Sequence, residues 1–247
     1  MDASNAAAQV ALGTVLFLSD WNWSGARRSL ERALDIAADH TEGWLLYGRL
    51  LEALGYLAEG LAAKQRVLER DPSSATVHLH IALSYWNQRR YDDMIAWAAR
   101  ALALDPHHLL AREYLAAAYL HKSDRERHMA ESLTHATAAG APQELLADLR
   151  RAFDTRGRAG VVDIALRVNA DGPPLPLALL HAEAGHLDEA YRRLDDAIAL
   201  RDPALVHLAV APQWDPLRTD AARFRAQLDV MGLAAAADRA QRFLQMR

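Results

Sequence analysis

Residues 75–106 read ATVHLHIALSYWNQRRYDDMIAWAARALALDP, and the pattern of this stretch recurs along the chain. Its defining positions are Ile81, Ala82, Tyr85, Met94, Ala98, Ala101 and Pro106. The same positions 34 residues earlier hold Tyr47, Gly48, Leu51, Gly60, Lys64, Val67 and Pro72. Another 34 residues earlier they hold Gly13, Thr14, Phe17, Ala26, Leu30, Ala33 and Ala38. Steps of three and four residues mark one face of a helix, and the fixed period predicts an array of helix-turn-helix repeats.

Six repeats are expected, followed by a tail that does not repeat. The repeats lie near residues 7–40, 41–74, 75–108, 109–142, 143–170 and 171–203, and the pattern is weakest in the fifth. Residues 204–247 contain two amphipathic segments, 221–231 and 233–246. Because a stack of repeats must cover its open apolar side, we expect residues 204–247 to form helices that cap the array. The expected fold is an all-α solenoid.

Single residues predict where helices cross and where they begin or end. The positions where two helices of a hairpin would cross are small, and only a small side chain allows the close approach of a packed pair; they are Gly48, Gly60, Ala82 and Ala98. The Asp-Pro steps at 71 and 105 should end the second helices, because the residue before a proline is disfavoured in helical geometry. The expected N-caps are Asn22 or Ser24, and Ser123 or Asp124.

Composition excludes several classes of protein. The 247 residues carry a formal charge of -4, which argues against a nucleic-acid-binding surface because phosphate binding requires clustered Lys and Arg. Cysteine is absent, so disulfides and thiol catalysis are excluded. The first residues, MDASNAAAQVALGTVLFL, lack a basic leader and are expected to form a helix rather than a secretion signal. No uncharged apolar run reaches membrane-spanning length, so we expect a soluble, cytoplasmic chain with no membrane contact.

The patterns that usually carry catalysis or metal binding do not occur. The chain has no GxSxG, no HExxH and no Gly-rich phosphate loop. His128 and His135 flank Glu131 on one expected helix, but two turns, roughly 10 Å, separate the two histidines, too far to share one ion. The arginines at 150, 151, 156 and 158 form a cationic cluster that is either a solvated helix face or a patch for an acidic partner. We expect no catalytic residues, no metal and no cofactor.

The repeat positions resemble the tetratricopeptide repeat family over about residues 7–203. The segments APQWDPLRTDAARFRAQLDVMGL and DWNWSGARRSLERAL are similar to the tetratricopeptide modules attached to bacterial winged-helix regulators and to adenylate cyclase-type or kinase-type signalling proteins. The resemblance implies a right-handed superhelix whose first helices line a concave groove, and a binding module without activity of its own. Since no winged-helix, cyclase or kinase segment is present, we expect a free-standing scaffold or a fragment of a longer protein.

Carrying the family's groove positions over to this chain gives a candidate partner-binding surface. Its residues are Leu45, Leu46, Arg49, His80, Leu83, Trp86, Asn87 and Tyr114. Family members that grip a C-terminal carboxylate use Lys and Asn here, but Leu45 and Leu79 stand at the Lys positions, so such a clamp is not expected. Aromatic residues and Arg anchor interfaces, which favours an apolar or amphipathic peptide. The competing interpretation is that Leu45, Leu83 and Tyr114 pack between helices.

Two functions remain open at this point. The first is a non-catalytic scaffold that binds a protein or peptide in bacterial signalling or transcription regulation. The second is a small-molecule-sensing domain of a larger regulator, with a small apolar ligand in the groove, since small-molecule sites are concave and mostly apolar. Stabilisation by a small molecule instead of a peptide would distinguish them. Replacing Trp86 and Arg49 by Ala is expected to leave helicity intact and to weaken partner binding.

Overall fold

The computed structural model describes residues 3–246, which form fourteen α-helices and three short 3-10 helices without a strand. The first twelve helices follow one another along the chain as six helical hairpins. They are α1 (Ala3–Leu18) with α2 (Trp23–Ile36), α3 (Thr41–Ala53) with α4 (Leu57–Leu68), α5 (Ala75–Asn87) with α6 (Tyr91–Leu104), α7 (Leu109–His121) with α8 (Arg125–Ala138), α9 (Gln143–Arg156) with α10 (Arg158–Val168), and α11 (Pro174–Glu183) with α12 (Leu187–Ala199). The expected all-α class is confirmed.

The turns inside the first five hairpins repeat with the same period as the helices. A residue with φ between 51° and 83° stands at every 34th position: Trp21, Gly55, Arg89, Ser123 and Gly157. Glycine adopts this left-handed region freely, whereas other residues pay about 1–2 kcal/mol for it. The backbone geometry of the hairpin therefore sets the turn. A positive φ at this position cannot be recognised from the sequence, because three of these five residues are not glycine.

Capping and close packing follow the sequence expectations. Asn22 caps α2 by accepting a hydrogen bond from the Gly25 amide at 3.0 Å, and Asp124 caps α8 in the same way. In the second hairpin, a Cβ atom added to Gly48 would lie 2.8 Å from the carbonyl oxygen of Gly60. Because such a contact is too short for any real side chain, the crossing of α3 and α4 depends on glycine.

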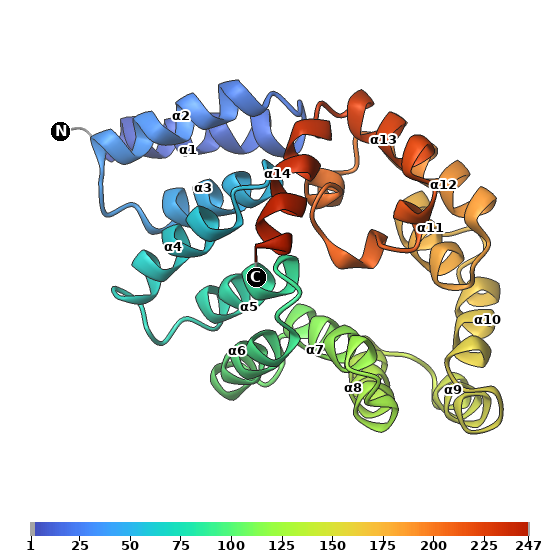
Figure 1. The fold of residues 1–247 in the computed structure, drawn as a ribbon. Coiled ribbons are helices and arrows are strands. Elements are labelled where there is room, and N and C mark those ends of the chain that lie inside the picture. Colours follow the sequence, from blue (N-terminus) through green and yellow to red (C-terminus); the bar gives the residue numbers. More distant parts are fainter. Residues whose placement is uncertain (1–2, 247) are drawn as a thin grey trace. The chain divides into compact units, whose positions relative to one another are not determined.

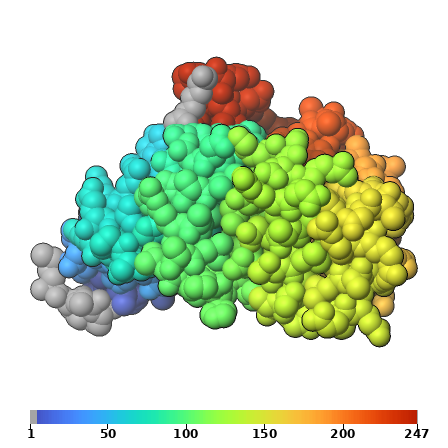
Figure 2. Space-filling view, turned by 90° about the horizontal axis from the view of Figure 1, so that it is seen from below, coloured from blue at the N-terminus to red at the C-terminus, as the bar shows by residue number. Residues whose placement is uncertain are grey.

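The described residues divide into two compact units. Unit 1 contains residues 3–72 and 197–246, and unit 2 contains residues 73–196. In unit 2 the hairpins from α5–α6 (green) to α9–α10 (yellow) follow one another across the surface in chain order (Figure 2). One of its core clusters joins Met129 of α8 to Phe153 of α9 and Val161 of α10.

The tail packs against the first two hairpins inside unit 1 (Figure 1). It consists of η1 (Pro203–His207), η2 (Pro212–Trp214), η3 (Leu217–Thr219), α13 (Ala221–Val230) and α14 (Ala234–Gln245). The indole Nε1 of Trp23 donates a hydrogen bond to the Met231 carbonyl at 2.7 Å, and the Arg239 Nε donates one to the Leu54 carbonyl at 2.8 Å. The two expected amphipathic segments are therefore helices, and they contact the start of the array. The expected boundary between an array of residues 1–203 and a cap of residues 204–247 stays a prediction.

None of the helices within residues 3–246 is both long enough and apolar enough to cross a membrane.

Candidate binding surfaces

The eight candidate groove residues fall into both units. Leu45, Leu46 and Arg49 lie on α3 in unit 1. The other five lie on α5 and α7 in unit 2, and they are His80, Leu83, Trp86, Asn87 and Tyr114. We therefore describe two separate surfaces, one for each unit.

The face of α3 that carries Leu46 and Arg49 is covered by the tail. Leu46 is 6% exposed and shares a core cluster with Phe17 of α1 and Val206 of η1. The Arg49 guanidinium lies over the Phe17 ring, 5.8 Å from its centroid. His207 of η1 hydrogen-bonds to the Arg49 backbone. Two of the three candidate residues on α3 therefore pack against the chain's own tail, whereas Leu45 is half-buried.

His207 is neutral in this environment at ordinary pH. Burial, together with the positive charges of Arg49 and Lys64, lowers the pKa of its imidazole from 6.5 to about 3. Desolvation disfavours the charged form of a base, and nearby cations add to this effect. The docking of η1 against α3 thus requires an uncharged ring at position 207.

A buried ion pair lies beside this contact, between α3 and α4. The Lys64 Nζ is 2.8 Å from the Glu52 Oε2, and both side chains are 1% exposed. Burial lowers the pKa of the Lys64 ammonium, and the Glu52 carboxylate opposes this shift. Lys64 occupies the repeat position that holds Leu30 and Ala98 in the neighbouring hairpins. A polar pair thus replaces apolar packing in the second hairpin.

In unit 2, Trp86 is the centre of an aromatic cluster. Its ring centroid lies 5.6 Å from Tyr91, 5.6 Å from Tyr114 and 5.0 Å from His121, all with edge-to-face geometry. His121 and Tyr91 are stacked at 4.7 Å. We call these four residues the Trp86 cluster. Such ring pairs contribute about 0.5–1.5 kcal/mol each beyond their buried area, so the cluster joins α5, α6 and α7 firmly.

Exposure within the Trp86 cluster runs from a buried base to an exposed edge. Trp86 is 2% exposed and the adjacent Asn87 is 3% exposed, whereas Tyr114 is half-buried and His121 is exposed. Replacing Trp86 by Ala would remove core packing at a cost of about 3–5 kcal/mol. A loss of binding in that variant would therefore be mixed with a loss of packing, and Tyr114 and His121 are the better probes.

The remaining candidates on α5 are only partly accessible. Leu83 packs against a core cluster of Leu79, Ala101 and Ala111, as the competing interpretation holds for this residue. His80 is half-buried. Sequence reasoning did not include Tyr91, because it begins the second helix of its hairpin, outside the first-helix positions that the family resemblance marks. The sequence feature that could have indicated Tyr91 is its position as an aromatic residue directly after the turn between α5 and α6.

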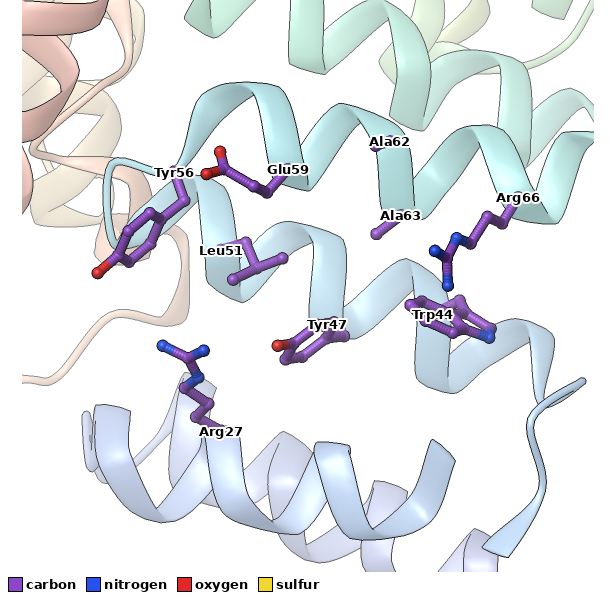
Figure 3. A pocket seen from close by; sticks show the side chains of 9 residues that line it. All are labelled: Arg27, Trp44, Tyr47, Leu51, Tyr56, Glu59, Ala62, Ala63 and Arg66. Carbon is purple, nitrogen blue, oxygen red and sulfur yellow. The ribbon is translucent and has the colours of Figure 1, made fainter. Parts of the chain in front are cut away.

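A pocket of about 470 Å³ lies on the opposite face of α3 from Leu46 and Arg49, between α2 and α4 (Figure 3). At about 100° per residue along a helix, Trp44, Tyr47 and Leu51 share this face. α4 contributes Glu59, Ala62, Ala63 and Arg66, with Tyr56 at its start and Arg27 on α2. The groove positions taken from the family do not include this face.

The charged residues considered for chemistry are paired with one another. The four clustered arginines of unit 2 each meet a carboxylate: Arg150 with Asp154, Arg151 with Asp148, Arg156 with Asp163, and Arg158 with Glu183. This favours a solvated, internally neutralised surface over a patch for an acidic partner. His128 is buried against the Ala116 carbonyl. Within the described residues, no group of three or more His, Cys, Asp or Glu is placed to hold a metal ion.

Comparison with known proteins supports the architecture. Residues 75–108, the third expected repeat, match the tetratricopeptide repeat family model. A search of curated proteins found no match. Among solved structures, a tetratricopeptide repeat protein from Parabacteroides merdae is 13% identical, with a TM-score of 0.54 over 99% of this chain and 100% of that chain.

Two larger proteins contain a similar arrangement of helices. A Thermobaculum terrenum O-GlcNAc transferase variant is 22% identical with a TM-score of 0.51, over 55% of this chain and 26% of that chain. A structure of Naa15/Naa10 bound to HypK-THB is 18% identical with a TM-score of 0.50, over 94% of this chain and 39% of that chain. The present chain thus spans well under half the length of either, and identities this low show the fold alone.

Proposed function

We propose that this protein is a non-catalytic scaffold that binds a protein or peptide partner, with the Trp86 cluster as the anchor of its partner-binding surface. The observation that carries this proposal is the gradient within the cluster, from a buried Trp86 to a half-buried Tyr114 and an exposed His121. Interfaces concentrate their binding energy on rigid aromatic anchors that are held from below by packed neighbours. Edge-to-face contacts hold Tyr114 and His121 in this way.

The partner surface is assigned to α5 and α7 and not to α3. Leu46 and Arg49 already contact Phe17 and the tail, so their side chains serve the packing of unit 1. On α5 and α7, the rings of Tyr114 and His121 provide apolar faces with polar edges. This chemistry suits an amphipathic peptide segment. A role in bacterial signalling or transcription regulation in the cytoplasm is the context that the sequence resemblance suggests.

The similar folds are compatible with this role without identifying a partner. The Naa15/Naa10 structure is described as bound to HypK-THB, so a protein with this type of helical array is recorded in a protein complex. The transferase shows that such an array also occurs in an enzyme chain. We assign the binding role to the helical array itself.

Two matched substitutions on α7 test the proposal. Tyr114→Ala removes a ring of the Trp86 cluster, whereas Tyr119→Ala removes another partly buried ring five residues further along the same helix. Five residues turn the side chain by about 140°, so the two variants probe different faces. Thermal unfolding, followed by circular dichroism, measures how much each variant loses in stability, so that a loss of binding can be distinguished from a loss of fold.

The readout is the set of proteins that co-purify with the tagged chain from native cell extract, followed by a direct binding measurement with each. Tyr114→Ala should lower affinity about tenfold or more, as expected for an aromatic anchor, and Tyr119→Ala should retain it. The exposed pair His121→Ala and His107→Ala gives a second comparison; His121→Ala also loses two ring contacts, so its effect on stability is measured by thermal unfolding as well. Equal affinities within both pairs would remove the Trp86 cluster from the function.

A further inference from the structure

The pocket between α2 and α4 has an apolar floor and aromatic walls. Leu51 and Ala63 are buried at 7% and 4% exposure and form the floor. The half-buried rings of Trp44, Tyr47 and Tyr56 border it (Figure 3). All of these residues belong to the second hairpin of unit 1, and Arg27 of the first hairpin closes the opposite side. The pocket is open to solvent, so an extended segment can enter it from the side.

Hydrogen bonds fix the walls before any ligand arrives. The Tyr47 hydroxyl donates to the Glu31 Oε1 at 2.9 Å, and the Arg27 Nε donates to the same oxygen at 2.8 Å. The Trp44 indole donates to the Ala38 carbonyl at 3.0 Å. A binder loses little conformational entropy when its contact residues are already held in place. These rings are therefore preorganised as an apolar surface.

The pocket carries one cation that is positioned without an acidic partner. The Arg66 guanidinium lies 4.6 Å from the centroid of the Trp44 ring. Within residues 3–246, no carboxylate lies at ion-pair distance from Arg66, although its side chain is exposed at the mouth of the pocket. A guanidinium that lies over an aromatic ring can still bind a carboxylate through two parallel hydrogen bonds.

We propose that this pocket docks a partner segment in which a carboxylate side chain stands close to a large apolar side chain. The carboxylate pairs with Arg66, and the apolar side chain packs on Trp44, Tyr47 and Leu51. The inference rests on the proposed protein-binding role and gives it a second surface on the other unit. Arg66 and the exposed Glu59 line opposite ends of the pocket (Figure 3), so Arg66 favours a carboxylate beside Trp44, and the aromatic walls favour an apolar neighbour.

The probe is a phage-displayed library of random seven-residue peptides, selected on the immobilised full chain. Enriched peptides are then synthesised with a fluorescent label, and their affinities are measured by anisotropy. Acidic residues beside Leu, Ile, Phe or Trp should dominate the selected sequences. Arg66→Gln should weaken their binding at least about tenfold, because a charge-assisted pair is lost. Arg32→Gln, the same change at an exposed site on α2 outside the pocket, should leave binding within about twofold of wild type.

A second pair of variants fills the pocket without removing a contact. Ala62 lines the pocket and is exposed, so Ala62→Phe should block the peptides. Ala58→Phe places the same ring on the same helix outside the pocket lining, and it should not block them. Both variants are checked by thermal unfolding, so that a loss of binding is not confused with a loss of fold.

The remaining outcomes overturn the inference. They are the absence of enrichment, the selection of basic peptides, or binding that survives both Arg66→Gln and Ala62→Phe. Binding of the small carboxylate 3-phenylpropionate as tightly as the peptides would make this a small-molecule site instead. Peptides that depend on Tyr114 and not on Arg66 would support the Trp86 cluster and exclude the pocket. Dependence on Arg66 alone would support the pocket even if the Trp86 cluster fails its own test.

Discussion

Removal of Lys64 should destabilise the protein far more than removal of Lys122, the only other lysine in the chain. Lys64 and Glu52 form a 2.8 Å ion pair with both side chains 1% exposed. Lys122 pairs with Asp92 at 2.7 Å, but these side chains are 40% and 81% exposed. The substitution Lys→Met deletes the charge and preserves most of the volume, so the two variants differ mainly in the burial of the carboxylate that loses its ammonium.

The expected magnitudes follow from that difference. Breaking a buried pair on one side costs about 3–5 kcal/mol, because a buried charge loses its compensation. An exposed pair contributes about 0–1 kcal/mol. Since a whole domain is stable by only about 5–15 kcal/mol, Lys64→Met should shift the urea midpoint strongly, and Lys122→Met should barely move it. Far-UV circular dichroism during urea unfolding measures both.

The double variant Glu52→Met/Lys64→Met separates burial of charge from loss of packing. Replacing both ions by apolar side chains of similar size is often neutral or stabilising, so stability should return to within about 1 kcal/mol of wild type. In Glu52→Met alone, the Lys64 ammonium loses the carboxylate that opposes its lowered pKa, and this variant should regain stability as the pH is raised. The reasoning is refuted if Lys64→Met and Lys122→Met unfold at the same urea concentration.

Three further predictions concern unit 1. The folded pKa of His207 is about 3, against 6.5 for the free side chain, so the unfolded state takes up its proton first as the pH falls. Stability from this group is complete above about pH 7 and declines below about 6.5, by about 2 kcal/mol at pH 5. Urea unfolding should show this loss in wild type and in His107→Gln, and a loss smaller by about that amount in His207→Gln, because burial also lowers the pKa of His128 and His181. Gly48→Ala should cost about 1–3 kcal/mol by calorimetry, because its Cβ would lie 2.8 Å from the Gly60 carbonyl. Deleting residues 203–247 uncovers the apolar cluster around Phe17 and Leu46, so limited proteolysis should then cut first within α1 to α4, and cleavage of an intact unit 2 first would contradict this packing.

The hairpins could be predicted from the sequence because their determinants are local. The apolar face of a helix, a small residue at a crossing and a capping side chain act within one repeat. Gly48, Asn22 and Asp124 each perform the role that their position indicated. Because the repeats follow a period of 34 residues, the helix positions of the clearest repeat could be extended to the weaker ones. Even the fifth hairpin, whose pattern has faded, follows this spacing.

The contact between the tail and the first hairpins could not be predicted, because it depends on backbone groups that leave no mark in the sequence. The indole of Trp23 meets the carbonyl of Met231, 208 residues away. Any residue type presents the same carbonyl at that place. The resemblance to a repeat family assigned Leu46 and Arg49 to a groove by position alone. It carried no information about which segment of this particular chain covers them.

Two features of the second hairpin did leave a signal. Lys64 stands where the neighbouring repeats hold apolar residues, and Glu52 precedes it by twelve positions, the spacing that brings the two helices of a hairpin into contact. Three aromatic residues belong to that hairpin: Trp44 and Tyr47 on α3, and Tyr56 directly before α4. These residues depart from the repeat pattern, and the departures indicate that the second hairpin differs in function from its neighbours.

The second hairpin therefore has opposite requirements on its two sides. On one side, Leu46, Arg49 and the Lys64–Glu52 pair meet the tail or lie beside it, and every polar group there must be satisfied within the protein, because a buried unpaired charge is costly. On the other side, the Arg66 guanidinium lies over the Trp44 ring, and its side chain is exposed. If the first side serves stability and the second serves binding, Lys64→Met should change unfolding more than peptide affinity. Arg66→Gln should change affinity strongly and unfolding by at most about 1 kcal/mol, the value of an exposed cation–π contact. A loss of both properties in either variant would show that the two sides of α3 and α4 are not independent.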